Sequence, residues 1–361
     1  MTLGPVKYQF EYDERIRCAF IGAGGHSFRN VYPALQYAPV DLVAVCDINA
    51  ERAADYARLF GAAAHYADYR VMLAEQRPTA VFIVTSYNAD GRVQATDIAA
   101  DCLAAGAHVW MEKPTAASVA EIRELQRLSE KTERFVMTGV KKVFTPAMEK
   151  TKQILDSAEF GGARSISVRY PQGLPAERDQ PSMVGFLDHI YHPGAVLNYL
   201  MGPVERLSYE WDSVSGGSVT NLRFRSGAVG TMHLAAGSPV TSPLERVEVV
   251  GRDAAVVIDN SVELTYYRPG GRLPYGRSGS YIVEDNAAPL RWRPEFSLGQ
   301  LYNKNLFYLG YVPEILHFCE SVLTETPPQK GKLADSLAIM RLFEAYRFHP
   351  EGEIITLEES P

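Results

Sequence analysis

The sequence predicts a doubly wound α/β domain followed by an α+β domain with a large open, mainly antiparallel sheet. The chain has 361 residues, which is long for a single hydrophobic core. Short apolar runs alternate with helical patterns in the first part, whereas strand-length runs of alternating apolar and polar residues dominate the second. The pattern changes at Phe144-Thr145-Pro146, so we place the domains at residues 1–144 and 145–361.

Apolar segments of the first part are expected to be strands, at residues 16–21, 42–46, 80–85, 108–111 and 135–138. Helical patterns follow them, at residues 27–37, 49–60, 69–75, 94–105 and 118–132. The last helix opens with Ser118 and Glu121, which have the spacing of a capping box. Strands that are apolar on both faces and separated by helices are typical of a parallel sheet covered on both sides.

The second part is predicted to be an open sheet with helices on one face. Strands are expected at residues 165–170, 204–211, 218–224, 228–234, 246–250, 255–259 and 262–267, and Gly or Asp in the turns favours an antiparallel meander. Helices are expected at residues 147–157, 185–200, 312–323 and 333–347. Residues 268–305 are rich in Gly, Pro, Arg and aromatic residues, and we expect an excursion that is either an arm on a neighbouring subunit or a lid.

The composition argues against several kinds of partner. Hydrophobic residues make up 46% and charged residues 22%, as in ordinary globular proteins. The net charge is −7 and no long Lys/Arg run occurs, so neither nucleic acid nor a membrane surface is an expected partner. The first residues lack the pattern of a signal peptide. The cysteines form no CxxC pair, and we expect buried thiols in a reducing cytoplasm; they are Cys18, Cys46, Cys102 and Cys319.

The first expected strand runs directly into the glycine-rich stretch IGAGGHS at residues 21–27. Gly22 allows a tight turn, and Gly24 lets a phosphate group approach the backbone. A helix that begins near Ser27 presents free N–H groups and a positive dipole end to that phosphate. The turn therefore predicts a dinucleotide pyrophosphate site, although Ser27 replaces the usual third glycine; its residues are Gly22, Gly24, Gly25, His26 and Ser27. A glycine-rich turn without a ligand is the alternative.

Asp47 ends the second expected strand and bears on the choice of cofactor. At this position a carboxylate accepts hydrogen bonds from the adenosine ribose hydroxyls and repels a 2′-phosphate. The nearest arginine along the chain is Arg52, so the sequence favours NAD over NADP. We also assign Ile48, Thr85 and Ser86 to the cofactor site.

The stretch VWMEKPTA at residues 109–116 ends an apolar strand with an acid, a base and a proline. Ligands bind at the carboxyl edge of such sheets, so Lys113 is expected to point toward the nicotinamide. A partly buried ammonium there can hydrogen-bond a substrate oxygen. Glu112 is expected to hold the loop or to lie near the nicotinamide ribose, and Pro114 allows a cis bond after Lys113. A solvated surface lysine is the alternative, and the strand-end position argues against it.

With these motifs the chain resembles the Gfo/Idh/MocA family, the glucose–fructose oxidoreductase and inositol dehydrogenase group, through nearly its whole length. Its most specific mark is the Glu-Lys-Pro motif at residues 112–114. The other matching segments are residues 21–27 with 33–35, residues 68–69, residues 105–109, residues 139–146 and residues 314–318.

The resemblance implies that Asp188 and His192, which follow each other by one helical turn, work with Lys113. In that reading His192 takes or gives the proton at the reacting oxygen, and Asp188 binds substrate or tunes this acid–base pair. Lys141 is assigned to the substrate site with them. His189 is interpreted as structural, and a metal site at residues 188–192 is a minor alternative, so no metal is expected.

The chain departs from the family pattern at three places, which are residue 195, the region after the fourth strand and the glycine-rich turn. Ala195 stands where the family has an acid, and Ala95 stands near the position of a histidine. The loop at residues 86–93 is longer than usual, and the glycine-rich turn is one residue longer before Pro33. We therefore expect altered substrate contacts around an intact Lys113, Asp188 and His192.

These residues and the resemblance predict an NAD-dependent dehydrogenase that moves a hydride between the nicotinamide and a ring carbon of a sugar, cyclitol or glycoside. Two alternatives stay open: a glycosidase that oxidises C3 transiently, and an NAD(P)-sensing regulator without turnover. The intact Lys113, Asp188 and His192 argue against the regulator. We also expect a homodimer or homotetramer through the second sheet, because bulky groups on both of its sides would leave an exposed apolar face; they include Leu222, Phe224, Tyr266 and Tyr267.

Overall fold

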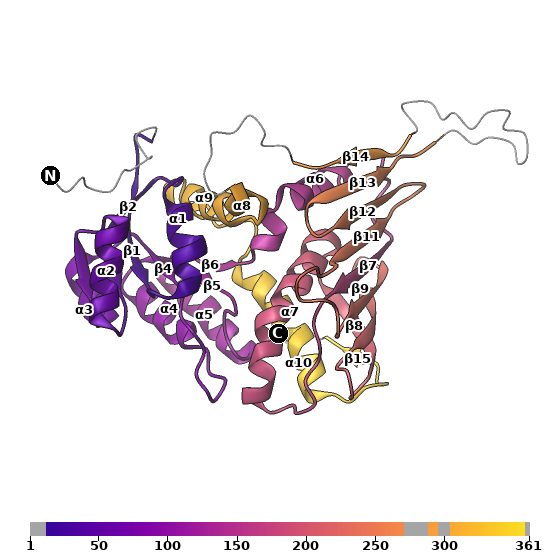
Figure 1. Ribbon diagram of the computed structural model, residues 1–361, viewed down its shortest axis with the longest axis horizontal. Helices are drawn as coiled ribbons and strands as arrows, with labels where there is room; N and C mark the ends of the chain where they lie inside the picture. Colours follow the sequence, from indigo (N-terminus) through magenta and orange to yellow (C-terminus); the bar gives the residue numbers. More distant parts are fainter. Residues whose placement is uncertain (1–11, 271–287, 295–303, 358–361) are drawn as a thin grey trace, which may run out of the picture. The chain divides into compact units, whose positions relative to one another are not determined.

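The computed structural model describes residues 12–270, 288–294 and 304–357 (Figure 1). Most of the excursion expected at residues 268–305 lies outside these residues. Its role as an arm or as a lid therefore stays a prediction. Contacts divide the chain into two compact units. The first unit comprises residues 1–141, 179–191 and 302–344, and the second comprises residues 142–178, 192–301 and 345–361. The domain boundary at residue 144 stays a prediction.

The first unit is built on a six-stranded parallel sheet with the order β3-β2-β1-β4-β5-β6 (Figure 1). The strands are β1 Ile16–Ile21, β2 Val40–Cys46, β3 Ala64–Tyr66, β4 Ala80–Ile83, β5 His108–Glu112 and β6 Val136–Gly139. The chain fills one side of β1 first and then crosses to the other, so the carboxyl ends of β1 and β4 flank the point where the order reverses. The predicted doubly wound fold is confirmed. Only β3 was missed, because it has three residues and none is buried.

The helices of this unit match the expected pattern, apart from the short α8 Lys304–Tyr308, which was not expected. They are α2 Ala50–Phe60, α3 Tyr69–Gln76, α4 Gln94–Ala104, α5 Val119–Thr132, α8 Lys304–Tyr308, α9 Tyr311–Leu323 and most of α10 Leu333–Phe348. Ser118 caps α5 as predicted, since its hydroxyl accepts the N–H of Glu121. The late helix α9 packs on β1, and its Phe318 meets Phe82 of the neighbouring strand β4 edge-on.

The helix after the glycine-rich turn is not a regular α-helix. It begins as a π-helix, η1 Ser27–Val31, and continues as the short α1 Tyr32–Leu35. A π-turn holds one more residue than an α-turn and is often found at functional sites. This wider turn lies between the glycine-rich loop and Pro33, where the sequence predicts one additional residue.

The second unit holds a nine-stranded sheet with the order β14-β13-β12-β11-β7-β10-β9-β8-β15 (Figure 1). The strands are β7 Ser165–Tyr170, β8 Val204–Trp211, β9 Ser218–Phe224, β10 Val229–Leu234, β11 Arg246–Val250, β12 Ala255–Asp259, β13 Glu263–Tyr267, β14 Leu290–Trp292 and β15 Ile355–Thr356. Among these strands only the β7–β10 pair is parallel, so the predicted mainly antiparallel sheet is confirmed. The helix α6 Pro146–Leu155 packs against β12 and β13, and η2 Lys141–Phe144 precedes it.

One face of this sheet is buried and the other is exposed, but the exposed face is more polar than expected. In β9, Leu222 and Phe224 are buried, whereas Asn221 and Arg223 alternate with them on the exposed side. Tyr266 is buried as well. The four bulky residues are therefore split between the two faces as expected, with Leu222, Phe224 and Tyr266 on the covered side and Tyr267 on the open side. Exposed apolar side chains on the open face are Val219, Val229, Val250 and Tyr267.

The helix α7 Gln180–Met201 links the two units, since residues 180–191 belong to the first and residues 192–201 to the second. It is longer than predicted because Asp179 caps it: the Asp179 carboxylate accepts the N–H of Ser182 at 3.1 Å. Within the described ranges, no helix is long and apolar enough to span a lipid bilayer.

Candidate cofactor and catalytic site

The glycine-rich loop passes close against the end of β4. Gly22 has φ +112°, and a Cβ atom at this position would lie 1.9 Å from the Val84 carbonyl oxygen. Only glycine fits both the backbone angle and the space. A Cβ at Gly24 would meet no atom within 4 Å, so its open side leaves room for a ligand. Gly22 thus forms the tight turn that its position predicted, and the approach of a phosphate at Gly24 stays a prediction.

Ser27 closes this loop in place of the missing glycine. Its side chain is fully buried, and its hydroxyl lies 2.8 Å from the Gly24 carbonyl and 3.2 Å from the Gly22 carbonyl. The same oxygen accepts the N–H of Gly24 at 3.0 Å. Helical hydrogen bonding starts with Phe28, so the N–H groups of the preceding first-turn residues remain available for a phosphate.

Asp47 at the end of β2 tethers the loop. One carboxylate oxygen accepts the N–H of Ala23 at 2.8 Å, and the other accepts the N–H of Asn49 at 2.9 Å. Each oxygen has a second lone pair, so both can still accept a ribose hydroxyl. Asp47 thus holds the glycine-rich loop as well as standing where a cofactor ribose is expected.

A cavity of about 490 Å³ lies at the carboxyl ends of β1, β2 and β4. Its walls include Asp47, Ile48, Thr85 and Ser86, which the sequence assigned to the cofactor. Thr85 Oγ1 is buried and has no hydrogen-bond partner among the described residues, which leaves it available to a bound group. The glycine cradle, the ribose acceptor and this unpaired hydroxyl together fit a dinucleotide.

Three arginines that were not assigned to the cofactor site from the sequence also line the cavity. Arg52, Arg70 and Arg92 line it and come from α2, from α3 and from the segment before α4. Arg70 forms an ion pair with Asp101, in which Nη2 lies 2.9 Å from Oδ2, and Arg92 forms an ion pair with Asp97. Spacing along the chain gives no signal for this gathering, because strand order brings the three segments together.

Lys113 and Asp188 form an ion pair within the first unit. Lys113 follows β5, and its Nζ atom donates to Asp188 Oδ1 of α7 at 2.7 Å. The two side chains are 15% and 22% exposed, so the pair is accessible without being fully solvated. The Lys113–Pro114 peptide bond is cis. The structure thus brings together two of the three predicted catalytic residues.

Glu112 faces the glycine-rich loop. Its Oε1 atom lies 3.0 Å from His26 Nε2, and its Oε2 atom accepts the N–H of Lys113 at 3.0 Å. Burial by itself would raise the pKa of Glu112, but the hydrogen bond to His26 and the charges of His26, Lys113 and Lys141 outweigh it and lower this pKa below its usual range. The carboxylate is therefore ionised and holds the loop, as one of its two expected roles requires.

Two residues of α9 extend this polar cluster. Tyr311 OH accepts Lys141 Nζ at 3.0 Å and lies 3.4 Å from His26 Nε2. Glu314 is fully buried, and its Oε1 atom accepts the N–H of Val140. Burial, together with the Glu112 charge, raises the pKa of Glu314 well above its usual range. The sequence predicted this helix, at residues 312–323, but gave no catalytic or cofactor role for Tyr311 or Glu314.

The two histidines of α7 differ in their surroundings. His189 Nδ1 is hydrogen-bonded to the Gly185 carbonyl at 2.8 Å and lies 3.8 Å from Asp188 Oδ2. His192 belongs to the part of α7 in the second unit, where its ring centroid is 6.1 Å from that of Tyr170. The roles of both histidines stay predictions.

Comparison with protein families places this site in a known context. Residues 16–140 match the GFO_IDH_MocA model, described as an oxidoreductase family with an NAD-binding Rossmann fold. Myo-inositol 2-dehydrogenase of Thermotoga maritima is 22% identical over 331 residues, which cover 88% of this chain and 91% of that protein. Glycosyl hydrolase family 109 protein 2 of Akkermansia muciniphila is 34% identical over 132 residues, or 34% of this chain and 27% of that protein.

A solved structure has the same fold over nearly the whole chain. Levoglucosan dehydrogenase, in a complex with NADH and L-sorbose, aligns with a TM-score of 0.75 and 18% identity. The alignment covers 92% of this chain and 96% of that one. The matched segment contains the glycine-rich loop, Asp47 and the Glu-Lys-Pro turn. Residues 16–140 therefore match a family of oxidoreductases with an NAD-binding Rossmann fold.

Proposed function

We propose that this protein is an NAD-dependent dehydrogenase of a ring hydroxyl in a sugar, cyclitol or glycoside, and that it also reduces the corresponding ketone. The observation that carries the proposal is the Lys113–Asp188 pair, 2.7 Å apart at the carboxyl end of β5. This edge of the sheet also holds the glycine cradle and Asp47. A cation held beside a dinucleotide site is suited to bind the oxygen whose carbon loses a hydride.

Lys113, Asp188 and His192 divide the work on the substrate. Bound NAD supplies the hydride acceptor for alcohol oxidation. The Lys113 ammonium donates a hydrogen bond to the substrate oxygen, and the Asp188 carboxylate orients that ammonium. His192, one helical turn after Asp188 in α7, takes the hydroxyl proton. Lys141 contributes a further donor for substrate hydroxyls.

The test measures NADH formation with a panel of cyclic polyols. The panel includes myo-inositol and levoglucosan, which occur in the names of two similar proteins. We expect an increase in NADH absorbance with at least one ring polyol and none with open-chain alcohols of equal carbon number. Turnover of open-chain alcohols alone would contradict the proposed substrate class. NAD should support this turnover better than NADP.

A glycosidase with transient oxidation is the second candidate, because the similarity to glycosyl hydrolase family 109 protein 2 is 34% over 132 residues. Such an enzyme would release the aglycone from an aryl glycoside while NAD is reduced and reoxidised in one cycle. Aryl-glycoside cleavage without net NADH formation would favour this candidate over the dehydrogenase. Absence of both reactions, with intact NAD binding, would favour a sensor.

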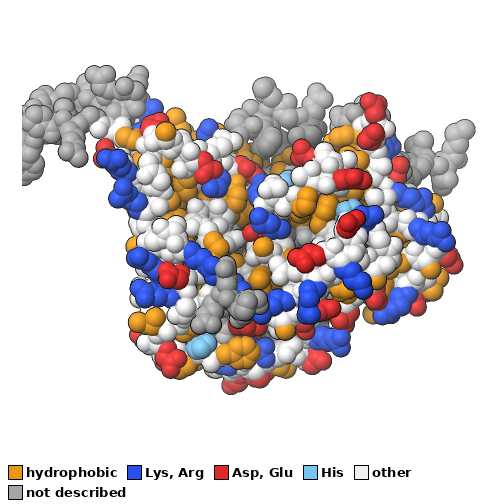
Figure 2. All heavy atoms as spheres, turned by 180° about the vertical axis from the view of Figure 1, so that it is seen from behind, with side chains coloured by type: hydrophobic (Ala, Val, Ile, Leu, Met, Phe, Trp, Pro, Cys, Tyr) orange, Lys and Arg blue, Asp and Glu red, His pale blue; other side chains and the backbone are white. Residues whose placement is uncertain are grey.

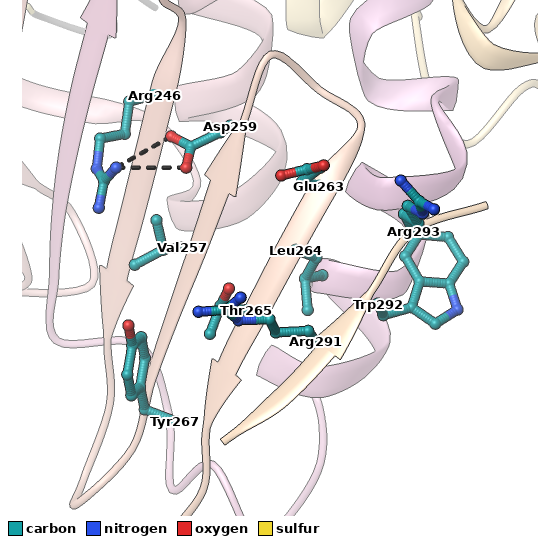
Figure 3. Close-up of a pocket in the computed structure, with 10 residues that line it drawn as sticks. All are labelled: Arg246, Val257, Asp259, Glu263, Leu264, Thr265, Tyr267, Arg291, Trp292 and Arg293. Carbon is teal, nitrogen blue, oxygen red and sulfur yellow. Dashed lines mark hydrogen bonds and ion pairs between the residues drawn. The ribbon is translucent and has the colours of Figure 1, made fainter.

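We infer that two copies associate through the open face of the nine-stranded sheet. A shallow cavity of about 560 Å³ lies on this face. Figure 3 shows Arg246 and Asp259 side by side there, with Nη1 of Arg246 3.1 Å from Oδ1 of Asp259. Acidic and basic side chains are also mixed on the side that Figure 2 presents, and the cavity on the open face is lined by Asp259 and Glu263 together with Arg291. Mixed charges suit a self-complementary contact better than a polyanion.

We also place the protein in a reducing cytoplasm. All four cysteines are buried as free thiols. Burial raises the pKa of Cys46 to about 12, mainly by desolvation, so this thiol is held in its unreactive neutral form. Free, unreactive thiols are typical of reducing compartments.

A further inference from the structure

Four hydroxyl groups meet directly behind the Glu-Lys-Pro turn. Thr115 Oγ1 lies 2.7 Å from Thr138 Oγ1 and 2.9 Å from Ser336 Oγ. Ser336 Oγ lies 3.0 Å from Thr138 Oγ1, which closes a triangle. The Tyr191 phenol accepts the backbone N–H of Thr115 at 3.3 Å. We call these four residues the hydroxyl cluster.

The hydroxyl cluster is completely buried and its partners are internal. The exposed fraction of each of its four side chains is at most 1%. Each Thr or Ser hydroxyl has one proton and two lone pairs, so the triangle can be satisfied with every hydroxyl donating once and accepting once. Hydrogen bonds arranged in this way strengthen one another in a medium of low dielectric constant. Loss of one member would leave its neighbours without partners in the interior.

Each member comes from a different element of the first unit. Thr115 follows β5, Thr138 lies in β6, Tyr191 in α7 and Ser336 in α10. Thr115 is two residues after Lys113, and Tyr191 is three residues after Asp188. The cluster therefore joins the backbone that carries Lys113 to the helix that carries Asp188.

Two further hydrogen bonds hold the backbone around Thr115, and neither of them involves a residue of α7. Thr96 Oγ1 donates to the Thr115 carbonyl at 2.9 Å, and Glu112 Oε2 accepts the N–H of Lys113. Both of these contacts are within the Rossmann part. Of the hydrogen bonds described at residues 112–115, the Thr115–Tyr191 bond and the Lys113–Asp188 pair are the two that reach α7.

We propose that the hydroxyl cluster is the positioning element that holds the Lys113 ammonium against the Asp188 carboxylate. The Thr115–Tyr191 hydrogen bond sets the separation of the two backbones, and the triangle behind it keeps both groups in place. The rotamers of Lys113 and Asp188 then close the remaining distance. This inference rests on the proposed function, in which that pair binds the substrate oxygen.

The first experiment needs no substrate. Acetic anhydride acylates lysine amines, and peptide mass spectrometry measures how much of each lysine is labelled. Labelling of Lys113 is compared with that of Lys152, which lies in α6 and forms an ion pair with Asp156. Lys152 is the internal reference. Thr115→Val keeps the side-chain volume and removes the hydroxyl. We expect Lys113 labelling to increase about fivefold in this variant, the scale of one net buried hydrogen bond. Thr115→Ser keeps the hydroxyl and should label like the wild type.

A matched control separates positioning from general destabilisation. Thr151 is also fully buried, but its hydroxyl bonds the Ala147 carbonyl of its own helix α6. Thr151→Val should lower the melting temperature as Thr115→Val does and leave Lys113 labelling unchanged. Equal labelling in Thr115→Val and the wild type, or an equal increase in both valine variants, would overturn the proposal. Ser336→Ala provides a second cluster variant should Thr115→Val fail to fold.

Kinetics with the polyol found in the substrate panel then separate the two proposals. Thr115→Val should lower kcat about tenfold, the order expected for a small misplacement, and leave the dissociation constant of NADH within about twofold. If Lys113→Ala lowers kcat and Thr115→Val does not, the cluster proposal fails and the proposed site stands. If Lys113→Ala keeps full turnover, the proposed site fails whatever the labelling result.

Discussion

Glu112 and Lys113 are neighbours in the chain, yet their side chains meet different partners. Successive residues at a strand end point in different directions, so one chain position can hold the glycine-rich loop while the next reaches α7. The Glu112 carboxylate is hydrogen-bonded to the His26 ring, and the Lys113 ammonium forms an ion pair with Asp188. The acid–base–proline sequence therefore places two separate interactions at the same edge of the sheet.

Lys113→Ala and His192→Ala should each lower kcat by about 10²–10⁴, the usual scale for a positioned acid–base group. NADH affinity should stay within about threefold, because neither residue lines the cavity next to Asp47. Steady-state rates and NADH fluorescence titrations measure the two effects. Lys152→Ala, which removes only a surface pair with Asp156, is the control. Full turnover in either variant would remove that residue from the mechanism.

Glu314 makes the stability of the protein dependent on pH in a direction that can be derived. Its pKa in the folded state is raised above that of the unfolded chain, mainly by burial. Its stabilising contribution is complete below the ordinary pKa of about 4.3 and is lost as the pH rises toward the folded-state value. In that window the folded state retains a proton that the unfolded state has released.

Glu314→Gln should therefore weaken the fall in stability between pH 5 and pH 8 by up to about 1.4 kcal/mol per pH unit, the value for one proton. Urea unfolding of both proteins at several pH values measures the slope. Glu320→Gln, an exposed glutamate in the same helix α9, is the control and should follow the wild type. Parallel curves for wild type and Glu314→Gln would show that Glu314 is ionised in the folded state.

At the scale of elements, the cofactor site depends on how a few segments end. The loop after β1 is held by Asp47 at the end of β2 and by Ser27 in the first turn of η1. After this loop the chain continues as the π-helix η1 and not as a regular α-helix. The glycine-rich loop, the end of β2 and the start of η1 are thus joined by hydrogen bonds.

Asp47→Ala should weaken NAD binding and narrow the preference for NAD over NADP. The variant loses a ribose acceptor and a charge that repels the 2′-phosphate. It also leaves the N–H groups of Ala23 and Asn49 without their carboxylate, so the melting temperature should fall as well. Dissociation constants for NADH and NADPH, with Asp55→Ala as an exposed control in α2, test this. A wild-type preference for NADP would contradict the role assigned to Asp47.

At the scale of the whole molecule, the open face of the nine-stranded sheet is the surface that an assembly would use. Strands β9 and β11 bury one side and expose polar residues together with single apolar ones on the other. Figure 3 shows Tyr267 next to this shallow cavity. Such a mixed surface resembles the polar interfaces of many oligomers more than a hydrophobic core.

Light scattering at micromolar concentration should give a mass of at least twice the 40.0 kDa of one chain. Combining Tyr267→Glu with Val250→Glu puts four like charges into a two-fold contact and should lower the mass to that of a monomer. Val214→Glu, at an exposed valine in the turn between β8 and β9, should leave the mass unchanged. A wild-type mass near 40 kDa at all concentrations would contradict the proposed assembly.

The sequence by itself determined the two sheets, most helix boundaries and the family resemblance, because these depend on local signals. Apolar runs with period two or complete burial specify strands, and Ser118 or Asp68 marks a helix start within a few residues. The Gly22–Ser27 turn, Asp47 and the Glu-Lys-Pro motif carry their chemistry in their spacing along the chain. For the same reason the short strand β3 escaped prediction, since three half-buried or exposed residues give no period.

Only the tertiary structure decided which side chains meet across long separations. His26 contacts Glu112, which is 86 positions away in the chain. Glu314 accepts the N–H of Val140 across 174 positions, and Thr115 is hydrogen-bonded to Ser336 across 221. The polarity of the open sheet face was likewise decided by strand register, which put Leu222, Phe224 and Tyr266 on the covered side. Side-chain contacts of this kind depend on strand order and helix packing, and no local pattern in the chain encodes them.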